Sequence, residues 1–589
     1  MSDLKSRGFD PLGVGLLLAG AACVVPFLQP THFLPIRTFY DEWLALAFGL
    51  AAVGLAAAKR RRAAVRIPAL ALLLIVYALF MAGWACSGHA AYAQLPMLWL
   101  LYSLFAALLV VLGHDFAASL GSERACDVLA SCLFSGALAN AVVGVLQVFG
   151  IPPQIDHLAA HLHGTRAIGN VGQANLYANY LALGEASLLY LYTRGRISLP
   201  PAVAAGLLLL TGAALASSRS SSLYALYFGV LGWVAYRRTA LVTTRRLGSG
   251  AMLLAIGVIL AQAMLPALRA SGISIEGEIR HDASPDSDPD RDATARMRLG
   301  AWEIAWRLFT ANPWTGVGPG QFAGAAYAQG LPPDMAAEGV WTSPHNLILQ
   351  LLSESGLPAA ALVCAGLAAW LWRTGNEYLR APNATLWWIT ACAGVEITHA
   401  LLEFPFWYAH FLGVTALVVG IGAGSGIAMP AFAFRSLFAS ATLAGLVILA
   451  VTIGDYFRFV LASPIAAGRS IAPDSDIAQD RNVLRQVSGG LLRPSAELWL
   501  FLALPLDSDA LGEKIAIGER LVRVWPSHQV ATRHCVFLAL SGRDLEVLAL
   551  FTRTLDAFTT RKTEIGRIIA EAPHEARVVL EPALRRKLP

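Results

Sequence analysis

The residues best suited to chemistry lie in short polar segments that interrupt a very apolar chain. One of them, Thr342-Ser343-Pro344-His345-Asn346-Leu347, holds a histidine in a turn whose entry Pro344 fixes. An imidazole takes up a proton near neutral pH, so a histidine in such a turn is a candidate general base. A lone histidine is more often structural, but the position of His345 beside an apolar segment favours a catalytic role.

A second polar segment, 217–222, separates two apolar segments and contains Arg219. If the basic loops of the chain face the cytoplasm, this arginine lies on the outer side of a membrane, where Lys and Arg are unusual. A guanidinium in that place suits an anionic partner, because it binds phosphate through paired hydrogen bonds. The alternative is a plain turn whose arginine reaches toward the interface.

Two other segments place polar groups near apolar ones without indicating one reaction. His157, His161 and His163 precede an amide-rich run at 169–175, and amides at the mouth of a membrane span are costly unless they are paired or used. A metal site would need converging ligands with a carboxylate or thiol, so a solvated interfacial helix is favoured. The alternating aspartates of 286–292 lack the glycine and glutamate of an EF-hand and indicate a solvated turn.

The segment His399–Tyr408 combines a histidine, a carboxylate and aromatic residues. Glu403 and Tyr408 could orient a base or contact a sugar, although an aromatic cluster at a membrane interface is more often an anchor. A Gly/Pro-rich run, 312–321, follows a predicted helix at 295–309. Its glycines would let the backbone approach a ligand closely, and an ordinary turn is the alternative.

The composition indicates a polytopic membrane protein that must position these segments. Of 589 residues, 56% are hydrophobic and 14% are charged, whereas soluble domains carry about 25% charged residues. The net charge of +5 is modest, and its basic residues lie in short loops, which argues against nucleic-acid binding. Because about 20 apolar residues cross a bilayer, we predict about thirteen membrane-spanning helices. They lie at about 11–29, 42–58, 67–86, 95–113, 126–150, 171–193, 198–216, 222–236, 250–267, 356–372, 385–402, 407–424 and 436–454.

The basic residues between these segments predict their orientation. All of the clusters fall on one side, taken as the cytoplasm: Lys5, Arg7, Lys59, Arg60, Arg61, Arg62, Arg194, Arg196, Arg237, Arg238, Arg245, Arg246, Arg373 and Arg435. The polar segments then lie outside, several of them in a long periplasmic loop at about 268–355. The predicted fold is therefore all-α and polytopic.

After a membrane domain at 1–455, the composition predicts a soluble helical C-terminal domain at 456–589, with a weak likeness to tetratricopeptide repeats. Apolar residues at helical spacing predict helices at 512–524 and 529–540, and Trp525-Pro526-Ser527 between them indicates a stop and a new start.

Four motifs, taken in their order, resemble those of the bacterial O-antigen ligase/polymerase superfamily. They are Arg166…Gly169-Asn170…Gln173…Asn175, Asn312-Pro313…Gly316-Val317-Gly318-Pro319-Gly320, Pro344-His345-Asn346 and Glu403-Phe404-Pro405-Phe406-Trp407-Tyr408. With His32…Pro35…Phe39-Tyr40…Glu42, they look most like the pilin-type O-oligosaccharyltransferases, which glycosylate proteins. The resemblance covers nearly all of the membrane region, and it depends on the order and sidedness of the motifs, none of which is specific alone.

The resemblance implies a glycosyltransferase of the bacterial inner membrane whose active site faces the periplasm. Such an enzyme moves a glycan en bloc from undecaprenyl pyrophosphate to Ser or Thr of exported proteins such as pilin, without a metal or other cofactor. A single displacement would invert the anomeric centre. By motif match, the resemblance assigns His345 as the base, Arg166, Arg219, Arg298, Gln173 and Asn170 to the pyrophosphate donor, and Glu403, Tyr408 and Asn346 to the acceptor, the sugar or support of the site.

Other functions stay open at this point. An O-antigen ligase, which uses a lipid A core acceptor, or an O-antigen polymerase would share the donor and differ in the acceptor. A transporter or flippase would show repeated halves and polar groups near the membrane midplane, whereas we expect the polar groups of this chain at span ends. A membrane scaffold would need none of the external motifs.

Overall fold

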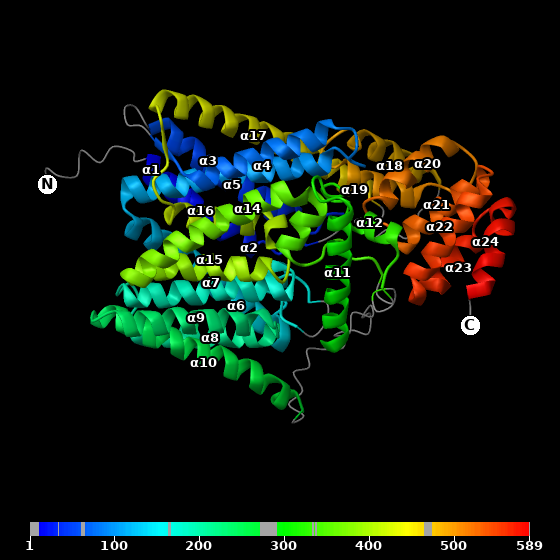
Figure 1. The fold of residues 1–589 in the computed structure, drawn as a ribbon. Helices are drawn as coiled ribbons and strands as arrows, with labels where there is room; N and C mark the ends of the chain where they lie inside the picture. The colour runs from blue at the N-terminus through cyan, green and yellow to red at the C-terminus, as the bar shows by residue number, and fades with distance from the viewer. Residues whose placement is uncertain are drawn as a thin grey trace.

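The computed structural model describes residues 11–32, 35–59, 65–162, 166–270, 291–332, 335, 339–463 and 474–587. Long helices run side by side in one body, and a smaller helical group packs on one end of it (Figure 1). The long body comprises α1 (Pro11–Ala22), α2 (Val25–Leu28), α3 (Phe39–Lys59), α4 (Ala69–Cys86), α5 (Gln94–Leu120), α6 (Ser122–Phe149), α7 (Ala174–Thr193), α8 (Leu199–Ala216), α9 (Ser220–Arg238), α10 (Val242–Ala270), α14 (Leu347–Arg380), α15 (Ala384–Ala400), α16 (Ala409–Ile421) and α17 (Ala431–Ala462).

The all-α polytopic prediction is confirmed, and each predicted span coincides with a helix of the long body. In the described part of the chain, nine helices are long and apolar enough to cross a membrane. The remaining predicted spans correspond to α7, α9, α15 and α16, which are shorter or more polar. Helix α7 is buried along most of its length against α6, α8 and α15, so its sequence carries polar groups that a lipid-facing helix would not.

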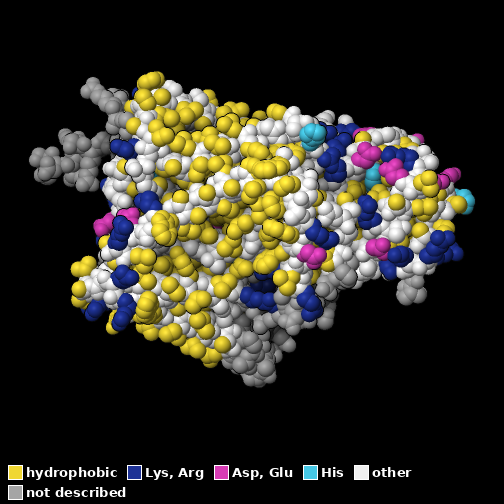
Figure 2. All heavy atoms as spheres, viewed as in Figure 1, with side chains coloured by type: hydrophobic (Ala, Val, Ile, Leu, Met, Phe, Trp, Pro, Cys, Tyr) yellow, Lys and Arg dark blue, Asp and Glu magenta, His cyan; other side chains and the backbone are white. Residues whose placement is uncertain are grey.

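Basic side chains gather at one end of the long body. Arg194 and Arg196 bind Glu123 and Asp127 beside the start of α6, and Arg373 donates to the carbonyl of Gly422 after α16. Figure 2 shows a broad hydrophobic surface over the long helices, with Lys and Arg side chains at the end opposite the smaller helical group. We call this the basic end. The other end, which carries α11 (Arg291–Ala311) and the smaller group, is called the site end.

A short antiparallel β ladder at the basic end joins the segment after α3 to the segment after α16. β1 (Val65–Ile67) follows α3, and β2 (Ile427–Met429) follows α16; Val65 pairs with Met429 and Ile67 with Ile427. These are the only strands among the described residues. The ladder joins segments from opposite halves of the chain.

At the site end, α11 crosses the ends of the long helices (Figure 1), and a turn then docks on a break in α14. The break is at Gly356, whose φ is 76°. The N–H of Val317 donates to Ser353 at 2.9 Å, and the N–H of Leu357 donates to Pro313 at 2.7 Å. The turn leads into α12 (Phe322–Gln329), and the chain returns to α14 through residues 341–346.

Gly316 of this turn and Gly356 of the break bring backbone against backbone. A Cβ on Gly316, which has a φ of 67°, would lie 2.3 Å from the carbonyl carbon of Glu354. A Cβ on Gly356 would lie 2.4 Å from the carbonyl carbon of Trp314. The predicted close approach of backbone is therefore present, but at Gly316 its partner is the backbone next to the break within α14.

The smaller group follows directly from α17, which continues past the predicted domain boundary at 455 to Ala462. It contains α18 (Asp474–Val487), α19 (Arg493–Ala503), α20 (Leu511–Val522), α21 (His528–Leu540), α22 (Asp544–Ala557), α23 (Lys562–Ala570) and α24 (His574–Lys587). The predicted helices at 512–524 and 529–540 are α20 and α21, and the Ser527 side chain caps α21 as expected.

The smaller group is anchored to the long body by specific contacts. Tyr92 donates to Glu497 at 2.8 Å, and Arg523 donates to Gln321 at 2.8 Å. The rings of Tyr456, near the end of α17, and Phe39 stack with centroids 3.6 Å apart, and both share a hydrophobic core with Leu500 and Phe501 of the smaller group. The smaller group thus packs on the turn and helix ends that form the site end.

We expect Gly316→Ala and Gly356→Ala each to destabilise the protein, because a side chain in a left-handed conformation costs about 1–3 kcal/mol before any clash is counted. Gly375→Ala is the matched control: it lies in α14 with no atom within 4 Å of its added Cβ. A helical Gly→Ala change stabilises by up to about 1 kcal/mol. Thermal unfolding in detergent measures the difference, and equal melting temperatures for all three variants would contradict the packing argument.

Candidate active site

His345 and Glu403 form the centre of the site. Nδ1 of His345 lies 2.7 Å from Oε2 of Glu403. The imidazole side chain is 21% exposed and the carboxylate 6%. Because a carboxylate only accepts hydrogen bonds, Nδ1 carries the proton, and Nε2 of the neutral ring keeps its lone pair. Nε2 makes no hydrogen bond within the described part of the chain. This is the arrangement of a base that a second residue orients.

The backbone at His345 is held in an unusual conformation. Its φ is 51°, in the left-handed region that non-glycine residues seldom adopt. The hydroxyl of Ser343 accepts its N–H at 3.1 Å, and the indole of Trp302 donates to the carbonyl of Pro344 at 2.9 Å. The Asn346 side chain caps α14 and donates to Leu401. Contacts on both sides of the histidine therefore fix its orientation.

The other carboxylate oxygen of Glu403 binds two further groups. Arg298 donates to Oε1 at 2.6 Å, and Asn175 donates to the same atom at 3.0 Å. Burial alone would raise the pKa of the Glu403 carboxyl. The hydrogen bond and the electrostatic attraction from His345, together with the positive charge of Arg298, outweigh burial and hold this pKa below its ordinary value. Glu403 is therefore ionised at neutral pH.

Asn175 connects this pair to a second arginine. Its side-chain oxygen accepts from Arg166 at 3.0 Å and from the hydroxyl of Ser218 at 3.1 Å. Arg166 also donates to the carbonyl of Ala216. Arg219 follows Ser218 directly in the chain and is exposed at the start of α9. Three arginines that are far apart in sequence, Arg166, Arg219 and Arg298, thus lie on or next to one hydrogen-bonded network.

Aromatic rings flank the histidine on its other side. The ring centroid of Trp341 is 4.6 Å and that of Phe404 is 5.0 Å from the centroid of His345. Phe404 in turn contacts Trp407 and Tyr408. These rings exclude water from one face of the imidazole, and a drier surrounding strengthens its interaction with Glu403.

The structure brings some of the predicted site residues together and leaves others apart. The network unites His345, Glu403, Arg298 and Arg166, and Asn346 holds the loop that carries the base. Gln173 instead caps α7 by accepting from Leu176.

Asn170 is buried, and its side chain is bonded to the backbone of Leu28, Leu158 and Ala160. Its geometry suits holding the loop before α7 and not contact with a ligand. Tyr408 lies in the wall of a neighbouring groove.

Asn175 and Trp302 are members of the network that no role was predicted for. Both lie in segments that the sequence singles out. Asn175 is at the start of α7, nine residues after Arg166, and Trp302 is one helical turn after Arg298. The i to i+4 spacing of Arg298 and Trp302 on one face of α11 was the available signal. It shows that a single helix positions both the carboxylate and the histidine loop.

The other candidate segments add nothing to this site. His157 and His161 lie in the loop before Arg166, while His163 and the aspartates of 286–290 fall outside the described residues. Among the residues that the structure describes, no three His, Cys, Asp or Glu side chains form a group suited to a metal ion.

Comparisons with known proteins agree with the predicted relationship. The O-antigen ligase family matches residues 204–364, a region that contains Arg219, Arg298 and His345. The family described as virulence factor membrane-bound polymerase, C-terminal, matches residues 387–565, which contain Glu403. A protein of Acinetobacter baylyi named general O-oligosaccharyltransferase is 25% identical over 413 residues, which cover 69% of each chain. The resemblance to the O-antigen ligase/polymerase superfamily and its oligosaccharyltransferase relatives is thereby confirmed.

We expect Glu403→Gln to lower kcat for glycan transfer by about 10²–10⁴-fold, because an amide can donate to Nδ1 and so favour the wrong imidazole tautomer. Glu403→Asp, which keeps the charge on a shorter arm, should lose less. Steady-state transfer in detergent or vesicles measures both. A wild-type kcat in Glu403→Gln would mean that the carboxylate does not orient the base.

The lowered pKa of Glu403 also predicts how stability depends on pH. A carboxyl with a depressed pKa in the fold stabilises the protein above its unfolded value, here 4.5, and loses that contribution as the pH falls through the folded value. The melting temperature of the wild type should exceed that of Glu403→Gln by a constant margin from neutral pH to about pH 4.5. The margin should shrink only below that. A margin that already narrows between pH 7 and 5 would contradict the lowered pKa.

Proposed function

We propose that this chain is a protein O-oligosaccharyltransferase. It transfers a glycan en bloc from undecaprenyl pyrophosphate to Ser or Thr of exported proteins such as pilin. The observation that carries the proposal is the single network that joins an oriented imidazole to arginines, through Glu403 and Asn175. The comparisons support glycan transfer of the O-antigen ligase type. That the acceptor is a protein is the part we propose in addition.

The two halves of the network suit the two halves of the reaction. Nε2 of His345 takes the proton of the acceptor hydroxyl as its oxygen forms a bond to the anomeric carbon, a role worth about 10²–10⁴-fold. The bond from that carbon to the pyrophosphate oxygen breaks, and its electron pair stays on the leaving group. Arg166, Arg219 and Arg298 stabilise this growing negative charge. Attack opposite the leaving group inverts the anomeric centre.

The location of the site supports an outer-face reaction in the bacterial inner membrane. Short loops rich in Lys and Arg face the cytoplasm, and these form the basic end of the long body. Helix α11 lies at the opposite end (Figure 1), and its Arg298 and Trp302 bind Glu403 and the carbonyl of Pro344 in the His345 network. A lipid-linked donor presents its head group to the network at that interface, and an exported acceptor reaches it from the periplasm.

The alternatives differ in what they require of this site. An O-antigen ligase or polymerase shares the donor half and differs only in the acceptor. Transport has one observation in its favour: Glu185 of α7 and Glu396 of α15 are buried within the long body. The expectation that polar groups lie only at span ends is therefore wrong for these helices. Asn179 is buried as well. Membrane helices place such polar groups in the bundle interior for packing as well as for transport, so their burial does not by itself favour transport.

We expect His345→Ala to lower transfer by at least about 10²-fold, because it removes the base, while the protein still inserts. The variant should unfold at a somewhat lower temperature than the wild type, since the buried carboxylate of Glu403 loses one hydrogen bond. Transfer from a purified lipid-linked glycan is the measurement, with His410→Ala, a buried histidine outside the network, as the control. Full activity of His345→Ala would exclude its assignment as the base.

The acceptor class is tested by mass spectrometry of exported proteins from cells with and without this chain. Glycopeptides that disappear with the chain support the protein acceptor. A parallel assay supplies the same lipid-linked glycan together with lipid A core. Glycan that appears only on the core would replace the proposed function by that of a ligase, and uptake without any glycan product would replace it by transport.

A further inference from the structure

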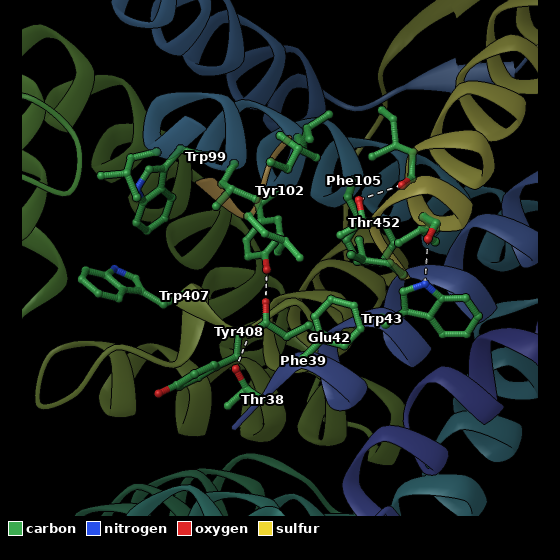
Figure 3. Close-up of a pocket in the computed structure, with 18 of the residues that line it drawn as sticks. Thr38, Phe39, Glu42, Trp43, Trp99, Tyr102, Phe105, Trp407, Tyr408 and Thr452 are labelled. Atoms are coloured by element: carbon green, nitrogen blue, oxygen red, sulfur yellow. Dashed lines mark hydrogen bonds between the residues drawn. The ribbon is translucent and has the colours of Figure 1, made fainter. Parts of the chain in front are cut away.

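A large apolar groove opens between α3, α5 and α17 at the site end (Figure 3). Its volume is about 600 Å³, within the range of ligand sites. Leu104, on the α5 wall, and Ala444, on the α17 wall, are both exposed. The groove continues beyond the long body, where Leu492, Pro494 and Trp525 of the smaller helical group line it. It therefore runs from membrane-spanning helices to the part of the protein outside them.

A cluster of three polar residues lies in the groove where α3 begins. Thr38 donates to one carboxyl oxygen of Glu42 at 2.6 Å, and Tyr102 donates to the other. Figure 3 shows the Tyr102 hydroxyl directed at Glu42, with Tyr408 and Trp407 beside them. Glu42 belongs to the His32 to Glu42 motif, and no residue of that motif takes part in the His345 network described above. The motif thus contributes to the groove.

Only a thin aromatic layer separates the groove from the candidate base. Trp407 and Tyr408 line the groove, and Phe404 lies between them and His345, with ring centroids 5.2, 5.9 and 5.0 Å from the three rings. Thr342, three residues before the histidine, also lines the groove. A molecule held here therefore lies close to the loop that carries His345.

The charges of the groove exclude the donor's head group. None of the described residues that line it is Lys or Arg, and its acidic member is Glu42. A pyrophosphate binds next to cations, and Arg166 and Arg298 belong to the Glu403 network and do not line the groove. A lipid A core, which carries phosphates, is disfavoured for the same reason. The second substrate that fits this groove is neutral or cationic, and apolar where it crosses the membrane.

We propose that the groove binds a transmembrane apolar segment of the acceptor protein and so presents its exported part to His345. This inference rests on the proposed function and adds to it that the preferred acceptors are membrane-anchored. Ala441, Ala444 and Gly445 give the α17 wall small side chains, which allow another helix to approach closely. The extension of the groove onto α19 and Trp525 follows the path of a chain that leaves the membrane.

The test fills the groove without touching the His345 network. Full-length Ala444→Phe is compared with Val447→Phe, which lies on the same helix, is 55% exposed and does not line the groove. Each is placed in phosphatidylethanolamine and phosphatidylglycerol vesicles with undecaprenyl-pyrophosphate-linked glycan. The acceptor is one identified by the mass spectrometry above, supplied with its transmembrane helix and as the same protein without it. Ala444→Leu provides a milder change should the phenylalanine variant fail to fold.

Ala444→Phe should raise KM for the anchored acceptor by about tenfold or more, toward the value for the unanchored form, and Val447→Phe should not. The unanchored acceptor and the donor should keep their KM values in both. A raised donor KM would place the prenyl chain in the groove and overturn the proposal, as would equal effects of the two variants. Wild-type protein that glycosylates lipid A core alone would instead remove the proposed function, and this inference with it.

Discussion

The ion pair at Glu403 is the interaction on which the rest of the site depends. A carboxylate that is 6% exposed is stable as an anion only when hydrogen bonds and opposite charges replace the water it has lost. Here His345 binds one oxygen, and Arg298 and Asn175 bind the other. The groups that stabilise this charge are also the groups of the site: the base His345, the cation Arg298, and Asn175, which connects to a second arginine.

That assembly explains the architecture of the site end. The partners of Glu403 come from α7, from α11 and from the loop before α14, so these elements must meet although they are distant in sequence. Helix α11 crosses the bundle with Arg298 and Trp302 on one face, and α14 breaks at Gly356 to receive the turn that follows α11. The break and the crossing helix are thus parts of one device that delivers the histidine to the carboxylate.

The sequence was informative about residues and helices and less so about contacts. Hydropathy located every helix of the long body, because lipid-facing surfaces must be apolar, but averaging over a window concealed Glu185 and Glu396. His345, Glu403 and Arg298 were recognised by type and motif order. Their pairing was not, since Arg298 and Glu403 are 105 positions apart. The sequence left open whether the amide of Asn170 is hydrogen-bonded within the protein or binds a ligand. Its hydrogen bonds to the backbone favour the first of these.

The β1–β2 ladder has a consequence for how the protein is made. It pairs Ile67 with Ile427, 360 positions later, and so closes the bundle at the basic end. During synthesis, α3 and α4 enter the membrane long before residues 427–429 leave the ribosome. Insertion of the early helices therefore precedes their final packing, and the bundle closes only after most of the chain has been translated. Until then, α3 and α4 lie in the membrane without their final partner, and insertion factors that cover exposed helix surfaces would bind such a pair.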